Sequence, residues 1–247
     1  MLRLILDLDP TDPAFGLALE EALLESVKNG GDDILRLWVN DRSVIIGRSQ
    51  SAKNEVDLDF LRSQSIPVLR RLSGGGTVYH YQGNLNMSLF LKDGRNLGTL
   101  KETYATIGRA IVDALSRVGI DAIVEGSVIL VNRKKIAGAA QVRHGKSLLY
   151  HTTLLIYPSA IPMEDLLLAM QDPYKPAFVA SNPRPVASLS QVSLGVTLEN
   201  LVRTLSGAIA QLLGQDVQEG KYTKEELEHA SQLESEKYRR DEWNLSR

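Results

Sequence analysis

The sequence predicts an α+β domain built around a mixed or mostly antiparallel β-sheet. Short apolar runs bounded by Gly, Pro, Asn or Asp dominate the first ninety residues, and such runs are typical of strands. Two longer segments, 99–119 and 197–213, carry apolar residues at spacings of three and four and predict amphipathic helices. Strands that dominate the first part of the chain, with helices between and after them, favour the α+β class.

Length and composition describe an ordinary globular chain. It has 247 residues, 43% of them hydrophobic and 23% charged, enough for one large domain with its own core. A formal net charge of −2 argues against a general nucleic-acid binder, which would be basic. The absence of cysteine excludes disulfides, thiolate metal sites and a cysteine nucleophile. No signal peptide and no apolar run near roughly 20 residues are found, so we expect a cytoplasmic protein.

The first elements are a strand and a helix. Residues 2–8 read as a strand that Asp9-Pro10 ends. Asp12-Pro13 opens a helix, with Asp12 as its N-cap, and the helix ends at 29–31. Its acidic side chains are expected to face away from its apolar side: Glu20, Glu21 and Glu25.

The strands that follow surround a glycine-rich segment. Strands at 34–39 and 43–47 flank a turn and predict a β-hairpin. A short helix at 57–63, a strand at 67–72, and strands at 77–80 and 85–91 come next. The glycines at 74–76 therefore join one strand to another and do not open a helix.

The second half of the chain is expected to be more helical. After the helix at 99–119 we expect strands at 122–124, 128–131 and 147–157, a short helix at 162–170, an extended proline-rich loop at 172–185, the helix at 197–213 and an exposed charged helix at 223–240. We expect one domain, residues 1–247, with a core at about 1–215 and a charged helical tail at about 220–247.

The segment RRLSGGGTVYH, residues 70–80, combines cations with consecutive glycines. Consecutive glycines allow several backbone N–H groups to converge on one anion. The segment matches neither the P-loop nor the dinucleotide fingerprint. Arg70 and Arg71 would point to opposite faces of a strand, so Arg71, nearer the glycines, is the better candidate for anion contact. A glycine-rich turn with solvated arginines is the alternative interpretation.

A second cluster lies further along the chain. Lys134-Lys135 precedes IAGAAQ, and a lysine beside small residues can place its ammonium over a backbone-lined pocket. His151 stands out within an otherwise apolar strand. Taken alone, these residues also fit a basic turn and a core histidine. No Ser-His-Asp triad, metal-spaced cluster or pair of carboxylates stands out.

Together these blocks resemble the lipoate–protein ligase A family, of the biotin/lipoate ligase superfamily. The blocks are RRLSGGGTVYH at 70–80, GNLN at 83–86, KKIAGAAQ at 134–141 and His151, with agreement in LALEEALL, LRLWVNDRSVIIGRSQ and KYRRDEWNL. The resemblance covers nearly the whole chain. It implies the catalytic fold of biotin and lipoate ligases, which is similar to that of class II synthetases.

The resemblance implies a two-step activity. Lipoate attacks the α-phosphate of Mg-ATP to give lipoyl-AMP and pyrophosphate, and an acceptor lysine then takes the lipoyl group. Carried over by motif, the catalytic residue is Lys135. The ATP and adenylate residues are Arg71, Gly74, Gly75, Gly76, Thr77, Val78, Tyr79 and Lys135. The lipoate residues are Gly76, His80, Lys135, Gly138, Ala139 and His151. Asn84 and Asn86 are candidates to position phosphate or Mg²⁺, and no other metal ligand is expected.

The chain departs from the family pattern in three places. It reads KIAG where KISG is common, and YHTT, with His151, where HHGT is common, which affects the finer acyl contacts. We also expect no C-terminal accessory domain of the kind that many bacterial members carry. Shorter archaeal-type enzymes have this length and can depend on a separate small subunit for adenylation. The expected acceptors are lipoyl domains of 2-oxoacid dehydrogenase E2 subunits or proteins like the glycine cleavage H protein.

Two other functions remain open from the sequence. Acyltransferases of this fold form a thioester on cysteine, and that mechanism is excluded here. A lipoyl or octanoyl transferase that uses preformed lipoyl-AMP or an acyl-carrier donor is the first alternative. A non-catalytic lipoyl-binding subunit is the second.

Overall fold

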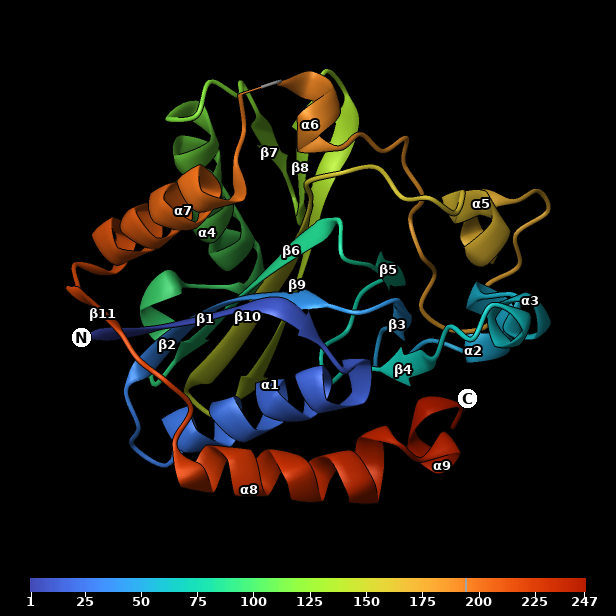
Figure 1. The fold of residues 1–247 in the computed structure, drawn as a ribbon, viewed down its shortest axis with the longest axis horizontal. Helices are drawn as coiled ribbons and strands as arrows, with labels where there is room; N and C mark the ends of the chain where they lie inside the picture. Colours follow the sequence, from blue (N-terminus) through green and yellow to red (C-terminus); the bar gives the residue numbers. More distant parts are fainter. Residues whose placement is uncertain (194) are drawn as a thin grey trace.

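The structure is a computed structural model that describes residues 1–193 and 195–247. A mixed eight-stranded sheet forms its centre, in the order β11-β1-β2-β6-β10-β9-β8-β7 (Figure 1). Its strands are β1 (Leu2–Thr11), β2 (Asp33–Asn40), β6 (Asn84–Leu91), β7 (Ile123–Glu125), β8 (Val128–Val131), β9 (Lys134–His144), β10 (Ser147–Leu155) and β11 (Val217–Glu219). Strand β1 runs parallel to β2 and β11, and the other pairs are antiparallel. The predicted α+β class with a mixed sheet is confirmed.

A second sheet of three strands lies beside the first. It contains β3 (Ser43–Ile46), β4 (Val68–Arg70) and β5 (Val78–His80), in the order β4-β3-β5. The predicted hairpin of 34–39 with 43–47 is therefore wrong. Both edges of β2 are already occupied by β1 and β6, so β3 pairs with β4 and β5. The glycine-rich segment joins β4 to β5, as the sequence predicts.

Helices cover both faces of the large sheet. Helices α4 (Leu100–Ser116) and α7 (Leu198–Leu213) pack on one face, and α1 (Pro13–Lys28) and α8 (Lys224–Leu233) lie on the other (Figure 1). Alternation along β6 separates the faces, because successive side chains point in opposite directions. Leu85, Met87 and Leu89 enter the core beneath α4 and α7. The alternating polar residues Asn84, Asn86 and Ser88 therefore face the α1 side.

Small elements complete the fold around the three-stranded sheet and the loops. They are α2 (Ala52–Glu55), α3 (Leu58–Ser63), the 3₁₀ turn η1 (Arg95–Leu97), α5 (Met163–Leu166), the 3₁₀ turn η2 (Leu168–Met170) and α6 (Leu189–Val192). The helix predicted at 162–170 is thus two short turns. Among the residues that the structure describes, no helix is long and apolar enough to span a membrane.

Three local expectations are wrong. Strand β1 continues through Asp9-Pro10 to Thr11, where its register with β2 shifts; a bulge accommodates the missing proline N–H. Glu20 is 3% exposed instead of facing solvent, because α1 is enclosed between the sheet and α8. The single helix predicted at 223–240 is α8, a π turn at Glu234–Tyr238 and α9 (Asp241–Asn244).

The C-terminal helices are also less exposed than predicted. Glu226 and Ala230 of α8 and Tyr238 of the π turn are buried, the latter two in the cluster that includes α1. The Tyr238 hydroxyl donates to Glu21 at 2.7 Å, and the Lys237 ammonium pairs with the same carboxylate at 2.7 Å. The charged residues of this segment therefore form a solvent-exposed face and also make specific contacts to α1.

Candidate active site

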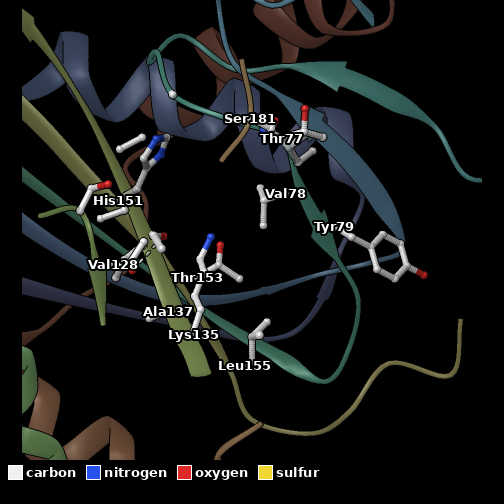
Figure 2. A pocket seen from close by; sticks show the side chains of 18 of the residues that line it. Thr77, Val78, Tyr79, Val128, Lys135, Ala137, His151, Thr153, Leu155 and Ser181 are labelled. Carbon is white, nitrogen blue, oxygen red and sulfur yellow. Dashed lines mark hydrogen bonds between the residues drawn. The ribbon is translucent and has the colours of Figure 1, made fainter. Parts of the chain in front are cut away.

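A cavity opens where the α1-side face of the large sheet meets the glycine-rich segment (Figure 2). Most residues predicted for the site line it: Arg71, Gly75, Gly76, Thr77, Val78, Tyr79, His80, Asn86, Lys135, Gly138, Ala139 and His151. Two predicted residues, Gly74 and Asn84, do not lie on its wall as the structure describes it. The fold thus brings the two sequence clusters together from β5, β9 and β10.

Lys135 extends from β9 into this cavity (Figure 2). A Cβ at Gly138 would lie 2.6 Å from Lys135 Cε and 2.7 Å from Nζ, so the lysine can lie over the strand only because Gly138 has no side chain. Burial lowers the pKa of Lys135, and the charges of Arg71 and Arg184 lower it further. The neighbouring Lys134 is exposed, as alternation along a strand requires.

Arg71 holds the backbone of the glycine-rich segment in place through hydrogen bonds. Its guanidinium donates to the carbonyl oxygens of Gly74 at 2.6 Å and Gly76 at 2.7 Å, to Ile45 O at 3.2 Å and to the Ser73 hydroxyl at 2.9 Å. Burial lowers the pKa of Arg71 to about 10, so it remains a cation at neutral pH. Its positive charge therefore lies at the cavity wall, while most of its N–H groups bind the protein.

The glycine-rich segment passes so close to the end of β3 that two positions must be glycine. Gly75 has φ of +87°, a region that side-chain-bearing residues rarely adopt. A Cβ at Gly47 would lie 2.1 Å from Gly75 O, which no side chain can tolerate. The glycines thus allow a backbone path that brings N–H groups to the cavity.

Arg70 points to the opposite side, as predicted. Its guanidinium donates to backbone oxygens of two segments: those of Gly47, Arg48 and Gln50, and those of Trp243 and Asn244. It therefore joins the end of β4 to α9 and takes no part in the cavity. Arg71 is the arginine that reaches the site.

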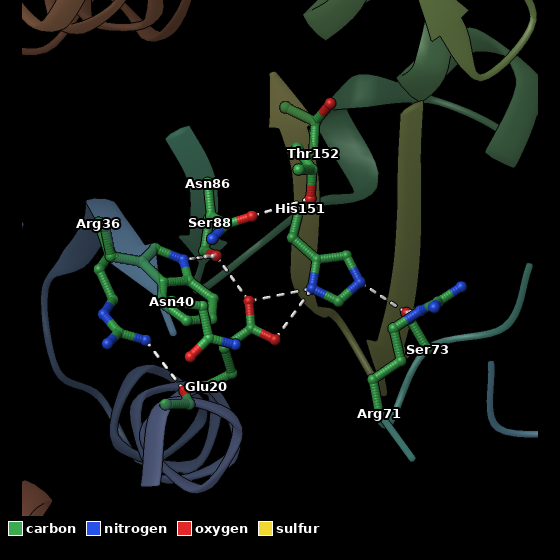
Figure 3. Close-up of polar contacts among 12 residues, drawn as sticks. Glu20, Arg36, Asn40, Arg71, Ser73, Asn86, Ser88, His151 and Thr152 are labelled. Carbon is green, nitrogen blue, oxygen red and sulfur yellow. Dashed lines mark hydrogen bonds and ion pairs between the residues drawn. The ribbon is translucent and has the colours of Figure 1, made fainter. Parts of the chain in front are cut away.

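Glu20, His151 and Ser73 form a linear hydrogen-bonded group (Figure 3). His151 Nδ1 lies 2.9 and 3.0 Å from the Glu20 carboxylate, and its Nε2 lies 2.6 Å from Ser73 Oγ. The order matches that of a hydrolytic triad. Ser73 is fully buried and does not line the cavity, so it cannot reach a substrate carbonyl. The group instead links α1, β10 and the glycine-rich segment.

The pKa of Glu20 reflects this group. Burial alone raises it, but the interaction with His151 and the hydrogen bond from Ser88 bring it below its ordinary value. Sequence reasoning missed Glu20 and Ser73 as site residues. The signal for Glu20 is a carboxylate in the middle of the apolar run LALEEALL, on the side that the sheet covers.

Trp38, also missed from the sequence, bounds the far end of the cavity. Its Nε1 donates to Ser88 Oγ at 3.0 Å, and that hydroxyl donates to Glu20 at 2.6 Å. The Arg36 guanidinium lies 4.1 Å from the centroid of the Trp38 ring, within the range of a cation–π contact. A Cβ at Gly16 would lie 2.9 Å from the ring. The indole is therefore fixed from several sides.

His80 lies on the cavity wall with both ring nitrogens occupied. Nδ1 lies 3.1 Å from Asn40 Nδ2, and Nε2 lies 3.0 Å from Thr153 Oγ1. Burial lowers the pKa of His80 to about 3, so the ring is neutral. This histidine therefore organises its neighbours and has no free nitrogen to donate to a ligand.

The proline-rich loop covers the glycine-rich segment, and the prediction that 172–185 is extended is confirmed. The Thr77 N–H donates to Ser181 Oγ at 2.9 Å, and the Ser181 hydroxyl donates to Glu55 at 2.6 Å. The Tyr174 hydroxyl binds the same Glu55 carboxylate at 2.5 Å. On this loop, Arg184 lines the cavity and pairs with Glu125 at 2.6 Å.

The site offers little to a metal ion. Within residues 1–193 and 195–247, no group of three or more His, Cys, Asp or Glu side chains could hold one. Asn84 Oδ1 is unpaired among the described residues, but Asn84 does not line the cavity, and Asn86 Oδ1 already accepts from Thr153 at 2.8 Å. A divalent ion here would have to arrive with ligands of its own.

Comparison with known proteins identifies the family. The sequence model of the lipoyl protein ligase A/B catalytic domain matches residues 12–210. The chain belongs to this family of lipoyl protein ligases. Lipoate-protein ligase A subunit 1 of Thermoplasma acidophilum is 30% identical over 255 residues, covering 98% of this chain and 96% of the relative.

Solved lipoate ligases share the fold over nearly the whole chain. A T. acidophilum protein with bound lipoic acid superposes with a TM-score of 0.84 at 30% identity, covering 98% of each chain. A bipartite ligase from the same organism, studied with its E2 lipoyl domain, gives 0.83 at 28% identity, covering 98% and 95%. A lipoate-protein ligase A bound with ATP gives 0.83 at 29% identity, covering 99% of each chain. The resemblance seen in the sequence is therefore confirmed.

Proposed function

We propose that this protein is a lipoate–protein ligase that activates lipoate with ATP and transfers the lipoyl group to a lysine of an acceptor domain. One observation carries the proposal: the Lys135 ammonium lies in the cavity between Gly138 and the glycine-rich segment. It makes no hydrogen bond or ion pair with any described residue. A partly buried cation without a partner, beside the glycine-rich backbone, is suited to an anionic ligand.

The first step joins two anions, and the cavity carries the charge to stabilise them. A lipoate carboxylate oxygen attacks the α-phosphorus of ATP, and the bond from phosphorus to the departing pyrophosphate breaks, leaving lipoyl-AMP. Lys135, Arg71 and Arg184 place positive charge around this point, whereas Glu20 and Glu125 are each paired with a cation or a histidine. The N–H groups of 75–79 supply further donors to the phosphate.

The second step transfers the acyl group to an amine. The neutral amine of the acceptor lysine attacks the lipoyl carbonyl carbon, the bond to AMP breaks, and an amide forms as the nitrogen loses one proton to solvent. Negative charge develops on the carbonyl oxygen and on the leaving phosphate, and Lys135 would stabilise both. The same ammonium thus serves both steps by stabilising negative charge and not by accepting a proton.

Magnesium would enter with the nucleotide. Mg²⁺ keeps several waters and is often bound by substrate phosphates with few protein ligands. The absence of an acidic cluster among the described residues fits this role. The ion would neutralise phosphate charge when bound, and the residues named above would orient the two substrates.

Acceptor domains and an accessory subunit are the proposed partners. The relative named subunit 1 and the bipartite ligase studied with an E2 lipoyl domain support both. We extend the proposal to acceptors like the glycine cleavage H protein, whose reactive lysine has the same chemistry. One feature favours a contribution from a second subunit. In this conformation the Thr77 N–H donates to Ser181 Oγ and the Ser181 hydroxyl donates to Glu55, so these groups are not free to bind a nucleotide.

The decisive test is an assay of each step. Purified protein is incubated with lipoate, ATP and Mg²⁺, and pyrophosphate exchange, lipoyl-AMP and modification of a lipoyl-domain lysine are measured. We expect all three signals, if necessary with a candidate accessory subunit added. No lipoyl-AMP under either condition would contradict the ligase. Transfer from supplied lipoyl-AMP without its synthesis would identify the transferase instead, and lipoate binding without either step would identify a non-catalytic subunit.

Lys135→Ala, with Lys134→Ala as its matched control, assigns the residue. The two lysines are adjacent, but only Lys135 enters the cavity. Loss of a charge-stabilising group in such a site typically costs about 10²–10³ in rate. We expect Lys135→Ala to lose at least that much in both steps, and Lys134→Ala to retain activity. Equal effects of the two substitutions would show that the assignment of Lys135 is wrong.

A further inference from the structure

Four residues in register form a row across the cavity floor. Trp38, Asn86, Thr153 and Gly138 pair in that order across β2, β6, β10 and β9. The row spans three strand spacings, roughly 14 Å. The Lys135 ammonium lies over Gly138 at one end, and the Trp38 indole closes the other. If Lys135 marks the carboxyl group, an acyl chain laid across the strands ends over Asn86 and Trp38.

A series of hydrogen bonds leads to this row, and the donor of each bond can be assigned. The Ser43 hydroxyl donates to Asp41 O at 3.1 Å, so its oxygen can only accept, and Asn40 Nδ2 donates to it at 3.4 Å. Asn40 Nδ2 also donates to His80 Nδ1 at 3.1 Å. In a neutral imidazole the proton then lies on Nε2. That N–H donates to Thr153 Oγ1 at 3.0 Å.

The last step of the chain orients Asn86. The Thr153 hydroxyl donates to Asn86 Oδ1 at 2.8 Å, which fixes the amide oxygen toward β10. The amide nitrogen therefore points away from β10, toward the β2 side of the row where Trp38 lies. Asn86 is 2% exposed, and its Nδ2 is buried with no hydrogen-bond partner among the described residues. It is an oriented, unpaired donor at the far end of the acyl cavity.

The other polar side chains that line this end of the cavity are already used. Asn40 Oδ1 is also buried without a partner in the described part of the chain, but Asn40 does not line the cavity. Trp38 Nε1 donates to Ser88, Ser88 donates to Glu20, and Glu20 binds His151. A ligand at this end therefore contacts mainly carbon atoms and polar groups that already have partners. Asn86 Nδ2 is the donor in the cavity lining there that a bound ligand either pairs or leaves unpaired.

We propose that Asn86 is a specificity-determining residue that selects sulfur-bearing acyl groups, by donating from Nδ2 to a dithiolane sulfur. The inference rests on the proposed function and deepens it. Lipoate has a carboxylate at one end and a dithiolane ring at the other, with only methylenes between. A plain fatty acyl group such as octanoate carries no acceptor at the far end and leaves the donor unpaired.

The discrimination comes from pairing a donor that is already buried. The free protein carries the cost of the unpaired Nδ2, so an acceptor at this end relieves that cost and an alkyl chain does not. The divalent sulfur of a dithiolane is a weak acceptor, so the gain is modest. His80 and Thr153 act as positioning residues, because they hold the amide with its nitrogen directed away from β10.

The test compares two acids in one variant. Asn86→Leu has nearly the same volume but no donor. kcat/KM is measured for lipoate and octanoate, and the binding of each acid without ATP is measured by calorimetry. We expect the wild type to prefer lipoate, and Asn86→Leu to lower that preference about tenfold, with octanoate unchanged or improved. A residue with a merely structural role would not lower one substrate and spare the other.

Thr153 variants test the positioning chain. Thr153→Val removes the hydroxyl that fixes Asn86 and is expected to lower the preference for lipoate, whereas Thr153→Ser restores it. Thr204→Val is the matched control, because Thr204 is also 8% exposed but lies on α7, remote from the cavity. It should change stability only.

Two results would overturn the inference. An equal loss for lipoate and octanoate in Asn86→Leu would place the donor at the carboxyl group instead. An unchanged preference in that variant would show that Asn86 does not select the substrate. Failure of the proposed function is distinct, because the wild type would then form an acyl-AMP from neither acid, whatever the Asn86→Leu variant binds.

Discussion

Polar side chains on the cavity face of the sheet bind one another before any substrate is present. His151 uses both ring nitrogens, on Glu20 and Ser73, and His80 uses both of its own. Buried polar groups are costly unless paired, so these contacts explain how so many can lie beside a core. The consequence is a preorganised wall on which few groups, the Lys135 ammonium and the Asn86 amide among them, are left for ligands.

At the residue scale, His80 makes stability depend on pH. Its pKa is about 3 in the folded protein and about 6.5 in an unfolded chain. Between these values the unfolded state binds a proton that the native state does not, so stability is lost as pH falls. We expect the advantage of wild type over His80→Gln to shrink by about 1.4 kcal/mol per pH unit below about pH 6.

Denaturant titrations of both proteins from neutral pH down to about pH 5 measure this difference. Other groups titrate in both proteins and cancel in the comparison. A difference in unfolding free energy that does not vary with pH would show that His80 is not held neutral.

Single residues differ in how well the sequence reveals them. Lys135, Arg71 and the glycines stand out because few core positions would accept them, and the structure places them together. Glu20 and Trp38 do not stand out, because an acid on a helix and a tryptophan in a strand are commonplace. Their roles depend on α1 lying across β6 and β10, a long-range arrangement that local patterns do not contain.

Among elements, β6 shows what alternation can predict. In NLNMSL the apolar residues enter the core and the polar ones face the α1 side, where Asn86 and Ser88 line the cavity, so the strand itself indicates which face carries the site. The hairpin prediction failed for the opposite reason. A turn between two strands is local, whereas the partner of β2 is β6, whose paired residues lie 48 to 56 positions further along the chain.

The proline-rich loop gives the prediction at the element scale. Ser181 accepts from the Thr77 N–H, one of the backbone groups proposed to bind nucleotide. ATP must displace that hydrogen bond to use the same N–H. Ser181→Ala removes the competitor, and a hydrogen bond worth about 1 kcal/mol corresponds to about a fivefold lower KM for ATP. Pyrophosphate exchange at saturating lipoate measures it.

Lipoate binding without ATP is the internal control for that variant, because it does not require the Thr77 N–H to bind a nucleotide. A higher KM for ATP in Ser181→Ala would mean that the loop already occupies its nucleotide-bound position. The loop would then contribute to the nucleotide site as it stands.

Across the whole molecule, the C-terminal segment closes the fold onto the start of the glycine-rich segment. Trp243 Nε1 donates to Arg70 O at 2.8 Å, and Asn244 Oδ1 accepts from the Arg70 N–H at 3.0 Å. The contacts link α9 with β4, while α8 packs along α1. Residues that the sequence reads as a charged tail thus help to position the backbone beside Arg71.

Arg70→Met tests this link between the two ends of the chain. Arg70 is 1% exposed and binds five backbone carbonyl groups, which would lose their donors together. We expect a loss of about 3–5 kcal/mol in unfolding free energy. Arg62→Met, which removes an exposed pair with Asp59, should stay within about 0.5 kcal/mol. In hydrogen exchange, 238–247 and 70–76 should both exchange faster in Arg70→Met, with α4 and α7 unchanged. Faster exchange throughout would mean that Arg70 supports the whole core and does not specifically couple the C-terminal segment to the site.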